Sequence, residues 1–475
     1  MESLKRVVAI LEEEGVVEPV GPLLLFRQPQ QLQAELDLSL GDAAKEDELW
    51  DCLKKITRHS VKTRHPGFLN QLYGGLDEYG LAGELLASAL NTNQYTYEVA
   101  PSLTLCEMEV IKRALSLVGF NNGDGIFTPG GSISNMYGLV LARYKKYPEI
   151  KEKGIAGMPP FVIYTSQDAH YSMTKGSHWL GIGTDNVIKV KTDQRGRMLP
   201  SALEEAIELT LAQGKVPMAV NSTAGTTVLG AFDNFQEIAD VCEKYGIWMH
   251  IDGCWGGSVV FSKKHSRLLK GIERADSFSW NPHKMLGAPL QCSMILVKEK
   301  GLLNAANRAG ATYLFQQDKM YDVSFDSGDK SVQCGRKTDA LKLWTLWKAR
   351  GDSGLARAVD DTMHLSRYFL EKIRDRIGFK LVLEEFQCTN ICFWYIPMRL
   401  RNKTEDQAWW EQVHAVAPKL KEKMVLDGCL MIGYQPLDHK NLRNFFRLVI
   451  TCRPERDEAF IDSVIENIDR LGRDL

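Results

Sequence analysis

The sequence predicts a mainly parallel α/β fold for most of this 475-residue chain. From about Gly125 onward, short apolar runs alternate with segments in which apolar residues recur at helical spacing. The helical segments begin with Pro or Asn and end with Gly, as helices prefer. This alternation is typical of a parallel sheet with helices on both faces, in which ligands bind beyond the carboxyl ends of the strands.

Three segments are predicted, since a single core stops growing at roughly 250 to 300 residues. An N-terminal helical segment covers residues 1–115, with helices at 31–38, 46–59 and 81–90. A large domain covers residues 116–345, with strands at 161–166, 187–192, 218–223, 247–252 and 277–280. A small α+β domain covers residues 346–475, with strands within 379–385, 389–396 and 444–450.

The composition argues against several classes of protein. The near balance of 58 basic and 60 acidic residues supplies no positive field to attract nucleic acid or an anionic membrane. Three glutamates, residues 12–14, interrupt the first apolar stretch, unlike a secretory signal, and no run reaches the roughly 20 apolar residues that cross a bilayer. The ten cysteines lack metal-ligand spacing, so no metal site is predicted, and Cys388 and Cys392 are interpreted as buried thiols. A cytoplasmic location fits best.

Five chemically active residues end or follow predicted strands: His170, Thr223, Thr226, Asp252 and Lys284. Taken alone, a loop lysine is usually a solvated surface charge, and a strand-end aspartate usually caps a turn. Together they fit carbonyl chemistry through an aldehyde cofactor, in which a lysine amine forms a Schiff base. Pyridoxal phosphate needs a carboxylate such as Asp252 to keep its ring nitrogen protonated, and His170 can stack on its ring.

A phosphate group needs its own binding site, and the sequence offers one at a predicted helix start. An amphipathic segment opens there, where free backbone N–H groups and the helix dipole favour an anion, with Gly130, Gly131, Ser132, Ser134 and Asn135. Asn281 and His283, which flank Lys284, are expected to reach the same anion. A glycine-rich helix start often binds nothing, so this motif gains weight only beside the strand-end residues.

Long motifs resemble the group II pyridoxal-phosphate decarboxylases. They include IDGCWGG, WNPHKMLGAPLQCS, GDGIFTPGGSISNMY and YLFQQDKMYDVSFDSGDKSVQCGR, and the resemblance extends over nearly the whole chain. Within that group the chain is most similar to the animal decarboxylases of cysteine sulfinate, aspartate and glutamate. The resemblance implies an aspartate-aminotransferase-like (type I) fold and an obligate homodimer whose active site lies at the subunit interface.

The resemblance also implies roles for individual residues. Lys284 matches the Schiff-base lysine, Asp252 the partner of the ring nitrogen and His170 the stacking histidine. Thr223 matches a hydroxyl at the ring substituents, and the phosphate-side positions match Gly131, Ser132, Ser134, Asn281 and His283. Tyr321 matches a tyrosine of a mobile loop that reaches the partner's site and protonates the substrate carbon after carbon dioxide leaves.

Substrate binding is implied at Gln71, Tyr73 and Arg447. Arg suits an acid group because its guanidinium grips a carboxylate or sulfinate through paired hydrogen bonds. Glutamate decarboxylases have a small serine where this chain has Tyr73. A bulky ring is expected to shorten the pocket, so cysteine sulfinate or aspartate is favoured over glutamate, which remains the alternative. The products would then be hypotaurine or β-alanine.

One motif departs from the family pattern, and two other functions remain open. Gly253 and Cys254 stand where two alanines are common, and Gly253 is expected to loosen cofactor packing. Transamination is an alternative reaction of the same cofactor, disfavoured by the Tyr321 loop. A catalytically silent scaffold is the other alternative, disfavoured because Lys284, Asp252, His170 and Tyr321 are all present.

Overall fold

The computed structural model describes residues 2–475 and divides into two compact units. The larger unit is Leu76–Met363, and the smaller combines Met1–Gly75 with His364–Leu475. This division differs from the three predicted segments. Strand β1 (Phe68–Leu69) pairs with β11 (Met431–Leu437), which joins the two ends of the chain in one sheet. Helix α5 (Pro101–Val118), predicted in the N-terminal segment, packs instead on strands of the larger unit.

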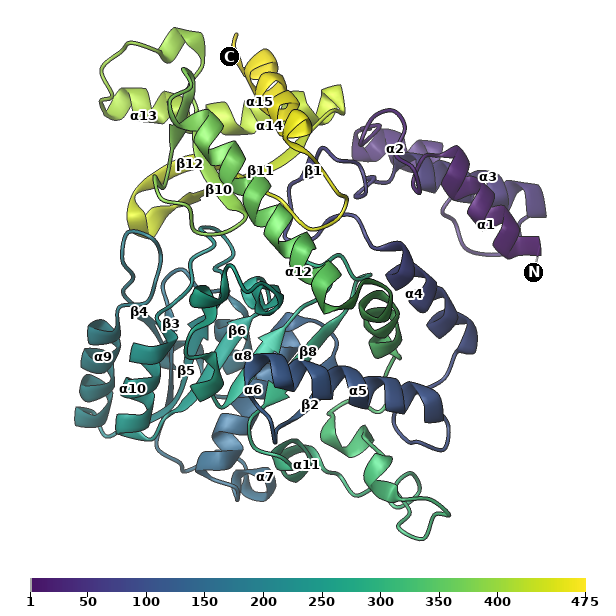
Figure 1. The fold of residues 1–475 in the computed structure, drawn as a ribbon, viewed down its shortest axis with the longest axis vertical. Coiled ribbons are helices and arrows are strands. Elements are labelled where there is room, and N and C mark those ends of the chain that lie inside the picture. Colours follow the sequence, from purple (N-terminus) through teal and green to yellow (C-terminus); the bar gives the residue numbers. More distant parts are fainter. Residues whose placement is uncertain (1) are drawn as a thin grey trace. The chain divides into compact units, whose positions relative to one another are not determined.

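The larger unit is built on a seven-stranded sheet, drawn in Figure 1, with strand order β2-β8-β7-β6-β5-β3-β4. The strands are β2 (Asp124–Thr128), β3 (Phe161–Ser166), β4 (Val187–Val190), β5 (Val216–Thr223), β6 (Trp248–Gly253), β7 (Ser277–Trp280) and β8 (Ser293–Val297). Only β8 runs antiparallel to its neighbours, so the predicted mainly parallel sheet is confirmed. All five predicted strands are present, whereas β2 and β8 were not predicted.

The larger unit also contains helices, most of which pack on this sheet. They are α4 (Glu78–Leu90), α5, α6 (Gly131–Lys146), α7 (Ile150–Lys153), α8 (Ser172–Trp179), α9 (Pro200–Ala212), α10 (Phe235–Tyr245) and α11 (Leu302–Asn307). The predicted end signals are present, since Pro200 opens α9, Asn234 caps α10 and Gly246 ends α10 in the left-handed conformation. Helix α12 (Asp339–Arg374) contains one non-helical residue, Gly351, and spans the boundary between the units.

Alternation along β6 separates the two faces of the sheet. Side chains two residues apart point to the same face of a strand, so His250 and Asp252 share one face. Helix α6 covers that face closely, because a Cβ on its Gly138 would lie 2.6 Å from His250 Nδ1. Gly253 points to the opposite face, against the ring of Phe278. The side chains of His250 and Asp252 therefore lie on the side of the sheet that α6 covers.

The smaller unit contains a five-stranded sheet with the order β1-β11-β12-β10-β9. Strands β9 (Phe379–Leu381), β10 (Asn390–Tyr395), β11 and β12 (Leu442–Val449) are antiparallel, and β1 is parallel to β11. The helices are α1 (Glu2–Glu13), α2 (Pro29–Glu35), α3 (Glu46–His59), α13 (Gln407–His414), α14 (Val416–Asp427) and α15 (Glu458–Gly472). The predicted α+β character is confirmed, and Cys388 and Cys392 are buried as expected.

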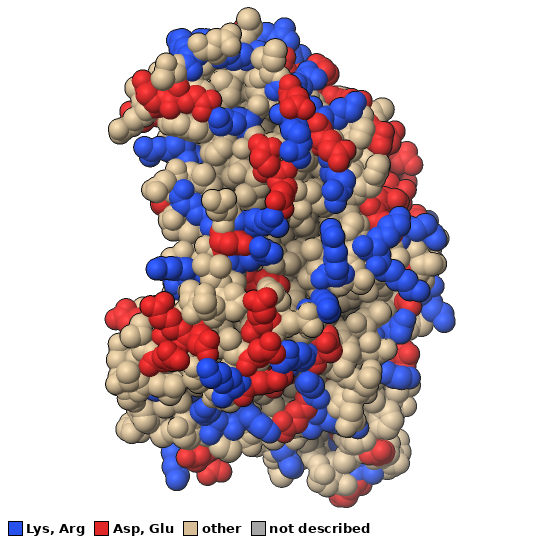
Figure 2. All heavy atoms as spheres, turned by 60° about the vertical axis from the view of Figure 1, so that its left-hand side comes forward, with Lys and Arg blue, Asp and Glu red and all other residues tan. Residues whose placement is uncertain are grey.

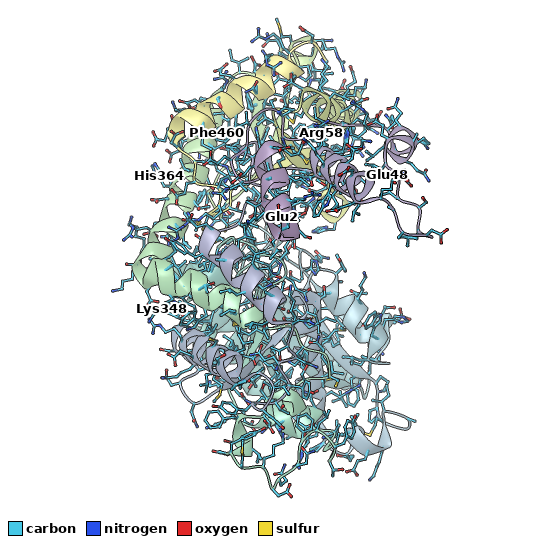
Figure 3. The ribbon with its side chains drawn as sticks, turned by 90° about the vertical axis from the view of Figure 1, so that its right-hand side faces the viewer. Glu2, Glu48, Arg58, Lys348, His364 and Phe460 are labelled. Carbon is cyan, nitrogen blue, oxygen red and sulfur yellow. The ribbon has the colours of Figure 1, made fainter. Side chains whose placement is uncertain are left out.

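The surface carries both signs of charge. On the face drawn in Figure 2, basic and acidic side chains are mixed, in line with the balanced composition. Arg58 of α3, labelled in Figure 3, forms an ion pair with Glu14 at 2.9 Å. Among residues 2–475, no helix combines the length and apolar character that a membrane span requires.

Candidate active site

A cavity of about 210 Å³ lies where the parallel strands of the larger unit end. Eight of the nine predicted cofactor residues line it: Gly131, Ser132, His170, Thr223, Asp252, Asn281, His283 and Lys284. They come from the start of α6 and from the segments that end or follow β3, β5, β6 and β7. The predicted residues therefore converge at the carboxyl ends of the strands, where sheets of this kind bind ligands.

Ser134 is the predicted cofactor residue that does not line the cavity. Its side chain is fully buried, and its hydroxyl lies 2.6 Å from Thr128 Oγ1. That contact ties the first turn of α6 to the end of β2. In this structure the Ser134 side chain stabilises the start of α6. Gly131 and Ser132 are the residues of the helix start that line the cavity.

Asp252 is a buried carboxylate that stays ionised. Its Oδ1 accepts from the Cys254 backbone N–H at 3.1 Å, and its Oδ2 accepts from Asn135 Nδ2 at 2.8 Å. Burial alone would raise its pKa, but the nearby Lys284 and His170, with these hydrogen bonds, hold the pKa below its ordinary value. A fixed negative charge thus lies in the cavity wall beside the Lys284 amine.

The two histidines of the cavity are neutral near pH 7. Burial lowers the pKa of His170, although the charge of Asp252 acts in the opposite direction. The His170 ring lies 4.1 Å from that of Tyr171, and its Nδ1 accepts from the Ser172 N–H at 3.2 Å. Burial lowers the pKa of His283 to about 4. Both rings therefore serve as polar surfaces rather than as cations.

The cavity meets the requirements of pyridoxal phosphate. Thr223 Oγ1 and Asn281 Oδ1 are buried, and neither has a hydrogen-bond partner within residues 2–475. A Cβ on Gly131 would come within 2.5 Å of Asn281 Nδ2 and of Cys254 Sγ, so only glycine leaves this side of the cavity open. The N–H groups that open α6 favour an anion at the same place. An amine, a fixed carboxylate and an anion site thus share one cavity.

The expected loosening at Gly253 is not what the structure shows. A Cβ there would meet the Phe278 ring, with Cε1 and the Ser279 carbonyl oxygen both at 2.8 Å. The space of the missing methyl group is already filled by Phe278 from the neighbouring strand. The glycine therefore matches its surroundings, and no gap is left behind the cofactor site.

Replacing Gly253 by alanine is expected to lower the free energy of unfolding by about 1 to 3 kcal/mol, because the added methyl group overpacks the core. Chemical denaturation of the Gly253→Ala protein measures this loss. The double variant Gly253→Ala, Phe278→Leu should recover part of it, since a smaller side chain makes room. A Gly253→Ala protein as stable as the parent would contradict this packing.

Two further polar residues, Asn135 and Tyr171, line the cavity. Asn135 was predicted as part of the phosphate-binding helix start, and in this structure its amide donates to Asp252. Tyr171, which follows His170, was not predicted. A larger hollow of about 320 Å³ lies beside α10. Its Lys145 and Arg274 are already paired with glutamates, at 2.6 and 2.7 Å.

Tyr321 lies in the long segment between α11 and α12. Its hydroxyl donates to Asp326 Oδ1 at 3.0 Å, and the same carboxylate accepts from Lys319 Nζ at 2.9 Å. The ring lies 5.2 Å from that of Tyr97. The neighbouring Met320 is fully exposed. The structure thus places the half-buried Tyr321 at a bend, held by a carboxylate of its own segment.

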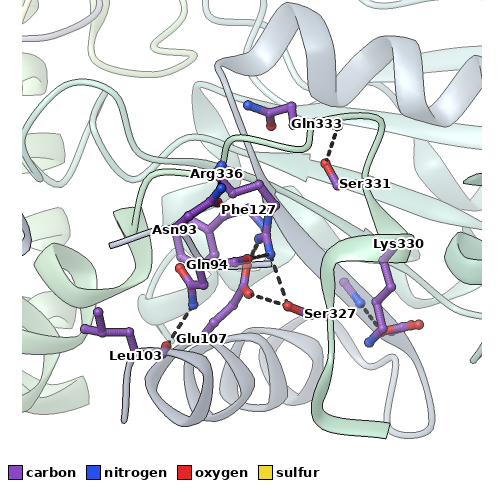
Figure 4. Close-up of polar contacts among 12 residues, drawn as sticks. Asn93, Gln94, Leu103, Glu107, Phe127, Ser327, Lys330, Ser331, Gln333 and Arg336 are labelled. Carbon is purple, nitrogen blue, oxygen red and sulfur yellow. Dashed lines mark hydrogen bonds and ion pairs between the residues drawn. The ribbon is translucent and has the colours of Figure 1, made fainter. Parts of the chain in front are cut away.

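The C-terminal part of this segment is anchored by a buried ion pair. Arg336 pairs with Glu107 and donates to the Gln94 carbonyl oxygen at 2.7 Å and to Ser327 Oγ at 3.1 Å, as Figure 4 shows. Glu107 also accepts from the Phe127 N–H at 3.1 Å. Breaking such a pair would leave an uncompensated charge at a cost of about 3 to 5 kcal/mol. Arg336 therefore fixes the end of the segment that carries Tyr321.

The predicted substrate residues belong to the smaller unit. Arg447 of β12 is buried and donates to the Asn70 carbonyl oxygen at 3.2 Å, so it lies next to the residue that precedes Gln71. The Gln71 side chain is exposed. The Tyr73 ring lies 5.8 Å from that of Phe68 and packs on the cluster of Leu23, Phe68 and Met431. The 68–73 segment and β12 are thus brought together.

The fold and the cavity define an α/β enzyme that uses pyridoxal phosphate. Comparison with known families agrees, since the model of the pyridoxal-dependent decarboxylase conserved domain matches residues 29–396. The chain belongs to this family, which makes it a pyridoxal-phosphate-dependent carboxy-lyase.

Individual relatives are similar over almost their whole length. Cysteine sulfinic acid decarboxylase of Mus musculus is 48% identical over 99% of this chain and 96% of that protein. Acidic amino acid decarboxylase GADL1 of Bos taurus is 50% identical over 95% of this chain and 86% of that protein. The crystal structure of mouse CSAD has a TM-score of 0.96, with 47% identity, and covers 99% of this chain and 98% of that chain.

Proposed function

We propose that this enzyme removes the α-carboxylate of a short acidic amino acid, cysteine sulfinate or aspartate, and releases hypotaurine or β-alanine. The observation that carries the proposal is the cavity in which Lys284 lies beside the ionised Asp252. The names of the relatives, a cysteine sulfinic acid decarboxylase and an acidic amino acid decarboxylase, support the substrate class. A cytoplasmic location fits the scattered cysteines.

The residues of the cavity divide the chemical work. Pyridoxal phosphate supplies an aldehyde that binds amines and a ring that withdraws electrons when carbon dioxide leaves. Lys284 would hold the aldehyde through its amine. Asp252 keeps a proton on the ring nitrogen through its negative charge. His170, neutral and partly buried, would cover the ring face and exclude water from it.

Two residues outside the cavity lining complete the proposal. Arg447 binds an acid group of the substrate, because a buried guanidinium offers a carboxylate paired hydrogen bonds. Tyr321 delivers a proton from its hydroxyl to the α-carbon, which commits the reaction to decarboxylation rather than transamination. In this structure the hydroxyl donates to Asp326, so that bond must break before Tyr321 can act.

Tyr73 is expected to set the preferred length of the substrate. The parent enzyme should turn over cysteine sulfinate or aspartate faster than glutamate, and Tyr73→Ser should shift the kcat/KM ratio toward glutamate by about 10- to 200-fold, the effect of one methylene. Product analysis on the three acids measures this. Tyr73→Phe is the control, because it keeps the ring that packs on Phe68. A clear preference of the parent for glutamate would refute the pocket argument.

We further propose a homodimer in which Tyr321 serves the partner's cavity. The family resemblance supports this assembly, and so does the apolar surface of α4, where Leu85, Leu86 and Leu90 are more than half exposed. A C2 dimer repeats each contact, so both cavities would receive the loop of the other subunit.

Mixing two inactive variants tests the shared site. In a hybrid of Lys284→Ala and Tyr321→Phe subunits, one cavity combines an intact Lys284 with an intact Tyr321 from the partner. Random mixing should therefore restore about a quarter of the parent activity, since half of the dimers are hybrids with one working site. Subunits mixed after crosslinking of each homodimer are the control and should stay inactive. No recovery on free mixing would place Tyr321 in its own subunit's cavity.

A further inference from the structure

A chain of buried hydrogen bonds runs beneath the cavity and ends on Asp252. The Trp248 indole N–H donates to Ser277 Oγ at 2.9 Å, and Ser277 Oγ lies 2.8 Å from His250 Nδ1. His250 Nε2 lies 3.0 Å from Asn135 Oδ1, and Asn135 Nδ2 donates to Asp252 Oδ2 at 2.8 Å. These side chains are buried, and Ser277 and His250 are fully so. None of the roles assigned above uses Trp248, Ser277 or His250.

The direction of this chain is fixed by Asp252. An ionised carboxylate only accepts hydrogen bonds, so Asn135 must present its NH₂ group to Asp252 and its oxygen to His250. That oxygen also only accepts, so His250 Nε2 must carry the proton. Burial lowers the pKa of His250 to about 4, so the ring is neutral and its Nδ1 accepts from the Ser277 hydroxyl. Each group then has one consistent role.

The same network extends to the histidine of the cavity. Asn135 Nδ2 also donates to Ser172 Oγ at 2.9 Å, and the Ser172 N–H donates to His170 Nδ1. Ser279 Oγ lies 3.3 Å from His250 Nε2 and can share its proton. Helix α6 accommodates the His250 ring through Gly138, where a Cβ would lie within 2.9 Å of three ring atoms. The packing therefore holds the ring in one orientation.

We propose that His250 and Asn135 are positioning residues that aim the Asp252 carboxylate at the cofactor ring nitrogen and couple it to the segment that holds His170. This inference rests on the proposed cofactor role of Asp252. A neutral histidine with a fixed tautomer orients the Asp252 carboxylate through Asn135. It does not compete for the proton on the cofactor ring nitrogen. If His250 were protonated on both nitrogens, its Nδ1 could no longer accept from Ser277. A positive charge would also lie next to Asn135.

Two serines provide a matched test. Ser277 and Ser258 are both fully buried, and each accepts an indole N–H, from Trp248 and Trp280 respectively. Only Ser277 continues to His250. With the holoenzyme, Ser277→Ala should shift the pH titration of the cofactor absorbance, weaken pyridoxal phosphate binding by about five- to tenfold and lower kcat at an unchanged KM. Ser258→Ala should leave all three as in the parent.

Variants of His250 add a rescue experiment. His250→Gln keeps one donor for Asn135 and one acceptor for Ser277, so its absorbance titration should stay close to that of the parent. His250→Leu removes both and should shift it further than Ser277→Ala does. The inference is overturned if Ser277→Ala leaves the titration unchanged, or if Ser258→Ala shifts it equally. A parent that binds the cofactor but releases no carbon dioxide would instead count against the proposed function alone.

Discussion

Replacing Lys284 by alanine is expected to abolish decarboxylation, with kcat/KM falling by more than about 10²- to 10⁴-fold, because removing the covalent attachment costs at least as much as removing one acid–base group. Lys284 is half-buried in the cavity, and its charge helps to hold the pKa of Asp252 below the ordinary value. Without the amine the cofactor loses its covalent attachment, and the carboxylate loses its neighbouring cation. Turnover and the visible absorption of the bound cofactor measure both losses.

Covalent trapping identifies the lysine directly. Borohydride reduction followed by peptide mapping should place the label on Lys284 in the parent and leave Lys284→Ala unlabelled. Lys300→Ala is the control, because Lys300 is exposed in the same unit and its loss should change neither labelling nor turnover. A label on another lysine of the parent, or full turnover by Lys284→Ala, would refute the assignment.

The central sheet and most of the cavity could be predicted because both depend on local patterns. Strands β3, β5, β6 and β7 are apolar runs that alternate with helices. Parallel strands end at one edge, so His170, Thr223, Asp252 and Lys284 had to meet there. Ser134 belongs to the same glycine-rich helix start as Gly131 and Ser132, but its hydroxyl contacts Thr128. No local sequence pattern specifies that orientation.

The features that were missed depend on contacts between distant parts of the chain. The two-residue strand β1 gains its place only by pairing with β11, more than 350 residues later, so the division into units could not be read locally. Gly253 matches the ring of Phe278 on the next strand, a packing relation that the family motif does not reveal. Asn135 and Asp252 lie 117 residues apart, although the Asn135 amide orients the carboxylate. Such pairs become visible only in the folded chain.

Replacing Asp252 by asparagine is expected to lower kcat by about 10²- to 10⁴-fold while Lys284 still captures the cofactor. The amide carries no charge, so it cannot keep a proton on the ring nitrogen. It also fits its partners poorly, because both Cys254 N–H and Asn135 Nδ2 need an acceptor and asparagine offers one oxygen. The loss should therefore appear in kcat and in the cofactor spectrum rather than in borohydride trapping.

The pH dependence of kcat separates the effect of the Asp252 charge from that of its side-chain shape. The pKa of Asp252 lies below its ordinary value, so its negative charge is present at neutral pH and is lost only as the pH falls through that lowered pKa. The parent should keep the part of its rate that depends on Asp252 down to acidic pH, whereas Asp252→Asn should lack it at every pH. Asp252→Glu restores the charge on a longer side chain and should recover part of kcat. If asparagine sustained the parent kcat across this range, a neutral ring nitrogen would suffice, and the role of the buried carboxylate would be structural.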